Sequence, residues 1–236
     1  MTFARRLAAE GLGTAILLVA VVGSGIMGER LSGGNVAVAL LANTIATGAT
    51  LVAIILALGT ISGAHFNPAV TLAAAMEHGV VWREVPGYVA AQFIGAFTGV
   101  AVAHLMFGEP LFSASQHARS GIAQILSEFV ATFGLLSVIW GCSRVRSTAV
   151  PFAVGAYITG AYWFTASTCF ANPAVTFARS LTNTFSGIRP ADAPGFVIAQ
   201  LLGAGAATLL WSWLLPSVSE SATDIVMSTK ERIHDQ

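Results

Sequence analysis

The sequence has 236 residues, of which 55% are hydrophobic and only 9% are charged, and its 11 basic and 11 acidic residues give a net charge of zero. Soluble domains carry about 25% charged residues, so this composition excludes an ordinary soluble protein and predicts an integral membrane protein embedded in the lipid bilayer. No basic cluster indicates a nucleic-acid partner, and the two cysteines have no neighbours at metal-ligand spacing, so we expect neither a metal nor a cofactor.

Six apolar stretches are predicted to form membrane-spanning helices, because a helix needs about 20 predominantly apolar residues to cross the bilayer core. Arg5 and Arg6 precede the first stretch, which is longer than the apolar region of a signal peptide and is therefore predicted to be retained. In chain order the six stretches cover about residues 7–27, 36–58, 87–107, 122–141, 150–164 and 195–215.

Two shorter segments between these spans begin with the same motif, NPAV. Asn67 starts the first copy and Asn172 starts the second, 105 residues later. Asparagine is a favoured helix N-cap and proline fits the first helical position, so each copy predicts a helix start. The segment from Asn67 to Glu77 has 11 residues and would be about 16 Å long, half of the bilayer core. Each segment is therefore predicted to dip into the membrane without crossing it.

The two halves of the chain also match outside these motifs. Glu10 in the first span corresponds to Glu128 in the fourth, and AQFIGA at 91–96 corresponds to AQLLGA at 199–204. We interpret this as an internal duplication within one channel domain at 1–216, with repeat 1 at about 5–107 and repeat 2 at about 120–216, followed by a polar tail at 217–236. Each repeat has three spans, so the second copy is predicted to be inverted in the membrane.

The predicted fold class is thus an all-α membrane protein with six transmembrane helices and two re-entrant half-helices whose N-termini meet near the midplane. If both termini are cytoplasmic, seven basic residues lie inside and four outside, and the positive-inside rule favours this orientation. The inner set is Arg5, Arg6, Arg83, Arg144, Arg146, Lys230 and Arg232, and the outer set is Arg30, Arg119, Arg179 and Arg189.

Irregular backbone at membrane depth is tolerated only where it is buried in protein or lines a water-filled cavity, so the loops before the half-helices predict a lumen. The side chains of Asn67 and Asn172 would offer hydrogen-bond donors at its centre. Two helix N-termini there would oppose a cation. We therefore expect a small, uncharged solute that can form hydrogen bonds. The carbonyl groups expected to line the lumen are those of Gly63, Ala64, His65, Thr168, Cys169, Phe170 and Ala171.

The paired NPA motifs, the segment SGAHFNPAVT at 62–71, the two matched glutamates and the order of the six spans resemble the aquaporin and aquaglyceroporin family over about residues 5–216. The resemblance implies a homotetramer with one pore per subunit, in the inner (plasma) membrane of the cell. It also implies that Glu10 and Glu128 brace the re-entrant loops by accepting hydrogen bonds from their backbone. The alternative is that these glutamates are ordinary interface residues.

By motif spacing without gaps, the selectivity filter of the family maps onto Thr47, Gly160, Cys169 and Val175. Most members have arginine at the Val175 position, and water-selective members have an aromatic residue and a histidine at the Thr47 and Gly160 positions. The resemblance therefore implies a filter that is wider and less basic than that of a water-only channel. Such a filter resembles that of bacterial aquaglyceroporin-like channels associated with arsenic resistance, which implies passage of water, small polyols, arsenite and methylated arsenicals.

Arg179 lies seven residues after Asn172 and returns to nearly the same face of the helix. It could reach back over the pore mouth and partly replace the missing filter arginine. Alternatively, it could extend outward to the lipid headgroups, as interfacial arginines do.

Other functions remain as alternatives to a channel with a metalloid role. One is a general water and glycerol facilitator. Another is a secondary transporter, which also uses inverted repeats but normally holds a titratable group beside its midplane site, where this chain has asparagines. We find no nucleophile with a base and no clustered metal site, so the chain is not expected to be an enzyme and no catalytic residue is assigned.

Overall fold

The computed structural model describes residues 1–215, and the predicted polar tail at 217–236 lies outside this range. The described residues contain eight α-helices and no strand, which confirms the predicted all-α class. The α-helices are α1 (Phe3–Leu31), α2 (Val36–Ser62), α3 (Pro68–Met76), α4 (Val85–Phe107), α5 (Ile122–Val145), α6 (Val150–Phe164), α7 (Pro173–Arg179) and α8 (Ala193–Leu214). Short 3-10 turns precede α4, α6 and α8: η1 (Trp82–Glu84), η2 (Ser147–Ala149) and η3 (Pro190–Asp192).

The long helices extend beyond the predicted apolar stretches at several ends. The clearest case is α2, which continues through the weakly polar residues 59–62 that we expected to be loop. It ends only at Gly63, whose φ of 92° lies in the left-handed region that favours glycine after a helix C-terminus. The re-entrant loop before the first motif is therefore short, running from Gly63 to Phe66.

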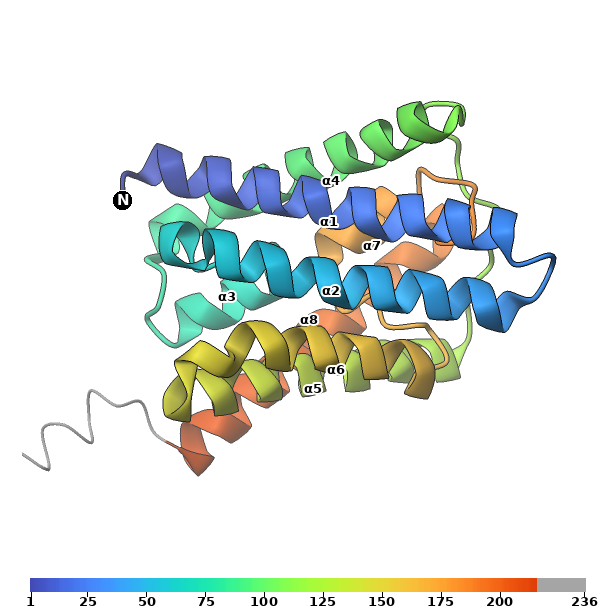
Figure 1. Ribbon diagram of the computed structural model, residues 1–236. Coiled ribbons are helices and arrows are strands. Elements are labelled where there is room, and N and C mark those ends of the chain that lie inside the picture. Colours follow the sequence, from blue (N-terminus) through green and yellow to red (C-terminus); the bar gives the residue numbers. More distant parts are fainter. Residues whose placement is uncertain (216–236) are drawn as a thin grey trace, which may run out of the picture.

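Five described helical stretches are long and apolar enough to cross a membrane: Phe3–Leu31, Val36–Ser62, Trp82–Phe107, Ile122–Val145 and Pro190–Leu214. The remaining predicted span, α6, has 15 residues, which corresponds to about 22 Å of helix. It nevertheless runs alongside α2 through the bundle (Figure 1).

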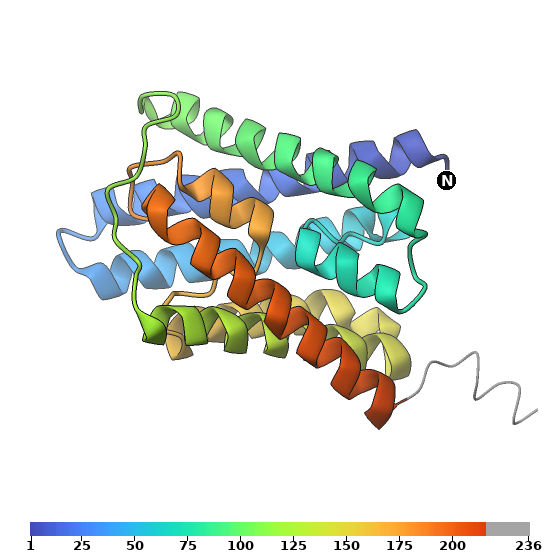
Figure 2. The ribbon, with the colours of Figure 1, turned by 180° about the vertical axis from the view of Figure 1, so that it is seen from behind.

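The eight helices form two similar groups. In the first, α1 packs against α2 and α4, and the half-helix α3 belongs to this repeat; in the second, α5 packs against α6 and α8, and the half-helix is α7. Each half-helix packs against both α4 and α8, so the two groups share their half-helix contacts. Figures 1 and 2 show α3 in one half of the bundle and α7 in the other, with their N-terminal ends directed toward the middle. The N-terminus and the end of α8 lie at the same end of the bundle. This is the inverted arrangement expected from an odd number of spans per repeat.

Glycines in the two repeated segments AQFIGA and AQLLGA allow close packing of matched helix pairs. A Cβ atom added to Gly203 in α8 would lie 2.5 Å from the carbonyl oxygen of Phe129 in α5. The matched Gly95 in α4 similarly meets the backbone of Gly11 in α1. A side chain at either position would force these helices apart, as expected for small residues at membrane helix interfaces.

Candidate pore and outer cavity

The two NPAV motifs form the N-termini of α3 and α7. The side-chain oxygen of Asn67 accepts a hydrogen bond from the backbone N–H of Ala69 at 2.9 Å, and that of Asn172 accepts from Ala174 at 3.0 Å. A proline follows each asparagine in the first helical position. Both half-helices therefore begin as the sequence predicts, with polar caps facing the middle of the bundle.

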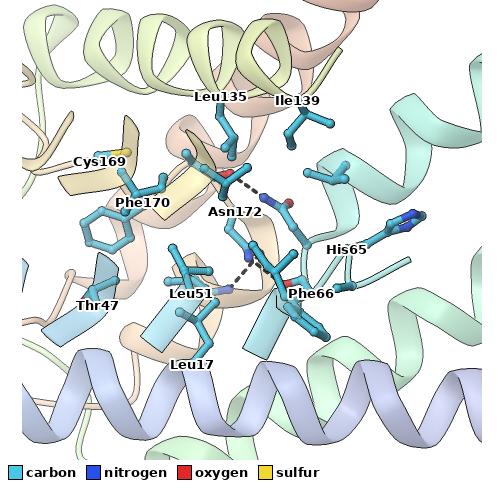
Figure 3. Close-up of a pocket in the computed structure, with 18 of the residues that line it drawn as sticks. Leu17, Thr47, Leu51, His65, Phe66, Leu135, Ile139, Cys169, Phe170 and Asn172 are labelled. Atoms are coloured by element: carbon cyan, nitrogen blue, oxygen red, sulfur yellow. Dashed lines mark hydrogen bonds between the residues drawn. The ribbon is translucent and has the colours of Figure 1, made fainter. Parts of the chain in front are cut away.

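The asparagine amide groups connect the two repeats across the centre. Asn67 Nδ2 donates to the carbonyl oxygen of Ala171 at 2.7 Å, and Asn172 Nδ2 donates to that of Phe66 at 2.8 Å (Figure 3). Each amide carries two N–H groups, so one donor per asparagine is used to hold the opposite loop. The sequence analysis assigned Ala171 as a lining carbonyl but missed Phe66, although the two residues occupy equivalent positions in the repeats.

The loops that precede the half-helices contain residues with left-handed backbone conformations. Ala64 and Phe66 have φ values of 51° and 50°, and Thr168, Cys169 and Ala171 have values of 60°, 52° and 47°. Non-glycine residues in this region cost about 1–2 kcal/mol each, so the surrounding structure must stabilise them.

Two fully buried glutamates supply much of that stabilisation. Glu10 accepts hydrogen bonds from the backbone N–H groups of His65 at 3.0 Å and Phe66 at 2.7 Å. Glu128 accepts from the N–H groups of Phe170 and Ala171, both at 2.9 Å. Each carboxylate thus satisfies two backbone donors of the loop that it contacts.

Two glutamines complete these networks, and the sequence analysis missed them. Gln92 donates through Nε2 to Glu10 and to Thr71 Oγ1, both at 2.8 Å. Gln200 donates in the same way to Glu128 at 2.6 Å and to Thr176 at 2.9 Å. Both glutamines belong to the repeated segments AQFIGA and AQLLGA, which the sequence analysis used only as evidence for the internal duplication. Their matched positions in the two repeats were the available signal.

A cavity of about 230 Å³ runs between the repeats past both asparagines. It is lined by loop residues and by apolar side chains of the long helices, among them Leu17, Leu51, Leu135 and Ile139 (Figure 3). In Figure 3, Thr47, Cys169 and Phe170 lie on one side of Asn172, and His65 lies on the other. The loop residues that line the cavity are Gly63, Ala64, His65, Phe66, Cys169, Phe170 and Ala171, whereas Thr168 lines a second cavity described below.

Three of the four predicted filter residues, Thr47, Cys169 and Val175, line this cavity, but Gly160 does not. Gly160 is exposed on α6, so the assignment by spacing does not hold for this residue. The cavity-lining positions of α6 recur every four residues, at Val150, Val154, Ile158 and Tyr162. Gly160 lies two residues from that series, which rotates it by about 200° to another face of the helix.

Tyr162 therefore brings an aromatic side chain to the cavity where the sequence predicted none. Its hydroxyl group donates to Thr47 Oγ1 at 3.4 Å, and the residue is only 2% exposed. The four-residue periodicity of the cavity-lining residues in α6 is visible in the sequence. The assignment by motif spacing did not use this periodicity and therefore selected Gly160 instead of Tyr162.

Arg179, the last residue of α7, also lines the cavity and is 1% exposed. Its Nε donates to the carbonyl oxygen of Ser186, and its Cζ lies 3.4 Å from the ring centroid of Phe170. The side chain is folded inward over the aromatic ring and does not extend toward lipid headgroups. The guanidinium group of Arg179 therefore makes this end of the cavity more basic than the absence of an arginine at the Val175 position implied.

A second cavity of about 140 Å³, called the outer cavity below, adjoins the first at Arg179, which lines both cavities. Its other polar lining residues are Asn43, His117, Arg119 and Thr168. Arg119 comes from residues 108–121, the connection between the two repeats, and sequence reasoning considered it only as an external charge. No sequence motif contains Arg119, so its position at the cavity becomes apparent only when the path of residues 108–121 in the structure is known.

The guanidinium group of Arg119 is held by three acceptors. Nε donates to Gly187 O at 2.8 Å, and Nη1 donates to Ser167 O at 3.1 Å and to Thr168 Oγ1 at 3.3 Å. Burial lowers the pKa of Arg119 to about 10, so the group is still charged at neutral pH. A second fixed positive charge therefore lies at the same end of the first cavity as Arg179.

Comparison with known proteins gives consistent results. The family described as Major intrinsic protein matches residues 1–166 and 141–233. The chain is 58% identical over 211 residues to aquaglyceroporin AqpS of Rhizobium meliloti, covering 89% of this chain and 90% of AqpS. It is 32% identical to a probable aquaporin, AqpM, of Archaeoglobus fulgidus, covering 91% and 98% of the two chains. The crystal structure of the aquaglyceroporin from Plasmodium falciparum matches the fold with a TM-score of 0.70 at 18% identity, covering 89% of this chain and 96% of that one.

Proposed function

The chain belongs to the major intrinsic protein family of membrane channels, and we propose that its pore passes water, small polyols and metalloid hydroxides such as arsenite and methylated arsenicals. The observation that carries this proposal is the cavity past Asn67 and Asn172, whose lining combines hydrogen-bonding groups of the loops with apolar side chains of the long helices. A neutral polyhydroxylated solute matches both kinds of group. An ion would have to give up its hydration against the apolar side chains.

We assign the selectivity filter to Thr47, Tyr162, Cys169, Val175 and Arg179. Val175 and the small residue Thr47 leave room for a solute larger than water. The guanidinium group of Arg179, in place of an arginine directly after the motif, supplies a donor for solute hydroxyl oxygens and repels cations. Tyr162 limits the width, so the filter is narrower and more basic than the motif spacing alone implies.

At the centre, the two half-helix N-termini and the remaining asparagine N–H groups orient a solute through its oxygen atoms and oppose cations. Glu10 and Glu128, with Gln92 and Gln200, act as braces that hold the loop carbonyls in place. We further infer a single channel domain at 1–216, assembled as a homotetramer in the inner membrane with both termini in the cytoplasm, as in the family that the sequence resembles.

Flux into reconstituted vesicles tests the proposal with water, glycerol, urea, arsenite and methylarsenicals. We expect wild-type vesicles to take up glycerol, arsenite and methylarsenicals at least tenfold faster than empty vesicles. Leu51→Trp, which fills the cavity, should abolish this uptake, whereas Leu56→Trp on the exposed side of the same helix should not. Uptake of water and glycerol without arsenicals would favour a general facilitator and reject the metalloid role.

A further inference from the structure

The outer cavity contains two buried arginines and no carboxylate among its lining residues. Arg119 is 9% exposed and Arg179 is 1% exposed. Among the described residues, neither guanidinium forms an ion pair; the ion pairs involve Arg6, Arg30, Arg144 and Arg189. Asp192 lies near Arg119, but it accepts from the backbone N–H of Arg119 and forms its ion pair with Arg189.

The hydrogen bonds of the two guanidiniums leave donors available. Arg119 uses Nε and Nη1, and Arg179 uses Nε, for bonds to neutral oxygens of the protein. Both groups also contact the ring of Phe170, with Cζ 5.1 Å and 3.4 Å from its centroid. Neutral acceptors and an aromatic face only partly offset the burial of two like charges.

The remaining polar groups of the cavity are suited to an anion. Thr168 carries a hydroxyl group, and His117 lies at the same cavity. His117 is an exposed residue. Desolvation and the charges of Arg119 and Arg179 lower the pKa of its ring, which in its neutral form can still donate one hydrogen bond. Guanidinium groups match the geometry of oxyanions because two parallel N–H groups can bind two oxygens.

From these observations we propose that the outer cavity is a binding site for a small oxyanion, held between Arg119 and Arg179. The site goes beyond the proposed function, because an oxyanion bound there would not continue into the pore past its apolar side. Arg179 lines both cavities, so a bound anion would sit at the outer entrance of the path taken by neutral solutes.

Isothermal titration calorimetry of the full chain in neutral detergent tests this proposal, with inorganic phosphate and sulfate as probes and chloride at equal ionic strength as the reference. We expect saturable binding of phosphate and sulfate that chloride does not reproduce. Arg119→Gln and Arg179→Gln should each weaken binding at least tenfold, and Arg119→Lys, which keeps the charge but loses the paired donors, should weaken it less. Arg30→Gln changes an exposed arginine predicted to lie on the same side of the membrane; it is the matched control and should bind like the wild type.

A parallel titration with glycerol phosphate distinguishes a free ion from an oxyanion carried on a larger molecule such as a lipid headgroup. No saturable binding to a wild-type protein that still conducts glycerol in vesicles would overturn the anion site while leaving the proposed function intact. Binding that survives in both Arg119→Gln and Arg179→Gln, or that disappears in Arg30→Gln, would also overturn it. If Arg119→Gln does not fold, Arg119→Lys and Arg179→Gln still decide the outcome.

Discussion

Val175 and Arg179 lie one turn apart on α7, and both line the pore cavity. The family resemblance associates the Val175 position with arginine, yet the guanidinium group comes from Arg179 instead. Because Arg179 stacks on Phe170, its charge lies at the outer end of the cavity and leaves the space beside Val175 to an apolar side chain. In the filter we propose, the charge that repels cations therefore comes from Arg179, and the apolar Val175 leaves room for solutes larger than water.

Introducing the arginine common in the family is the first residue-scale prediction. Val175 is 4% exposed, so Val175→Arg would add a second long, charged side chain to a confined space. We expect uptake of glycerol, arsenite and methylarsenicals into vesicles to fall at least tenfold, while water permeability falls less. Val175→Leu, which changes size without charge, is the control, and an unchanged solute profile in Val175→Arg would count against the filter assignment.

At the same scale, Gly160 shows the limit of transferring positions by motif spacing. Spacing counts residues along the chain, whereas access to the cavity depends on which face of α6 each residue occupies. The periodicity at Val154, Ile158 and Tyr162 carries that information, but it becomes decisive only when the packing of α6 against α2 and α5 is known.

Among the elements, the half-helices depend most on their surroundings. α3 has nine residues and α7 has seven, and isolated helices shorter than about 12–15 residues are marginal even in favourable sequences. Their positions are set by the asparagine bonds across the centre and by the glutamate and glutamine networks behind each loop. The sequence predicted the half-helices and the two glutamates. It did not predict the roles of Gln92 and Gln200, because their matched positions in the repeats do not show that each amide is buried against a glutamate.

An element-scale prediction concerns these networks. Gln200→Leu removes hydrogen bonds to Glu128 and Thr176, and hydrogen bonds to charged groups contribute about 1.5–3 kcal/mol each. We expect its free energy of unfolding in detergent to fall by about 2 kcal/mol and its glycerol flux to fall with it. Gln92→Leu should behave similarly in repeat 1, and Gln116→Leu, an exposed glutamine, is the control. If Gln200→Leu and Gln92→Leu both kept the stability and glycerol flux of the wild type, the bracing role of these glutamines would be rejected.

On the scale of the whole molecule, the inverted repeats bring both half-helix N-termini to the centre and place the N-terminus and the end of α8 at one end (Figure 1). The connection at 108–121 crosses the opposite end and carries Arg119 to the outer cavity. The orientation in the membrane is a prediction: the positive-inside rule favours a cytoplasmic position for the end that holds the N-terminus and the end of α8.

The orientation can be tested with a membrane-impermeant maleimide on intact cells. In a Cys142→Ala, Cys169→Ser background, Gln116→Cys should be labelled, because residues 108–121 are predicted to be external. Ser147→Cys, at the opposite end between α5 and α6, should be labelled only after the membrane is opened. The reverse pattern would show that the termini are external.

By itself, the sequence determined the membrane class, the helical spans, the two half-helix starts and the paired glutamates, because each depends on composition, local capping chemistry or the internal repeat. Only the tertiary structure decided that Tyr162 and not Gly160 lines the pore, that Phe66 and Ala171 accept from the opposite asparagines, and that Arg119 joins Arg179 at the outer end. These features depend on the rotation of each helix and the path of a long connection, which are set by packing between residues far apart in the chain.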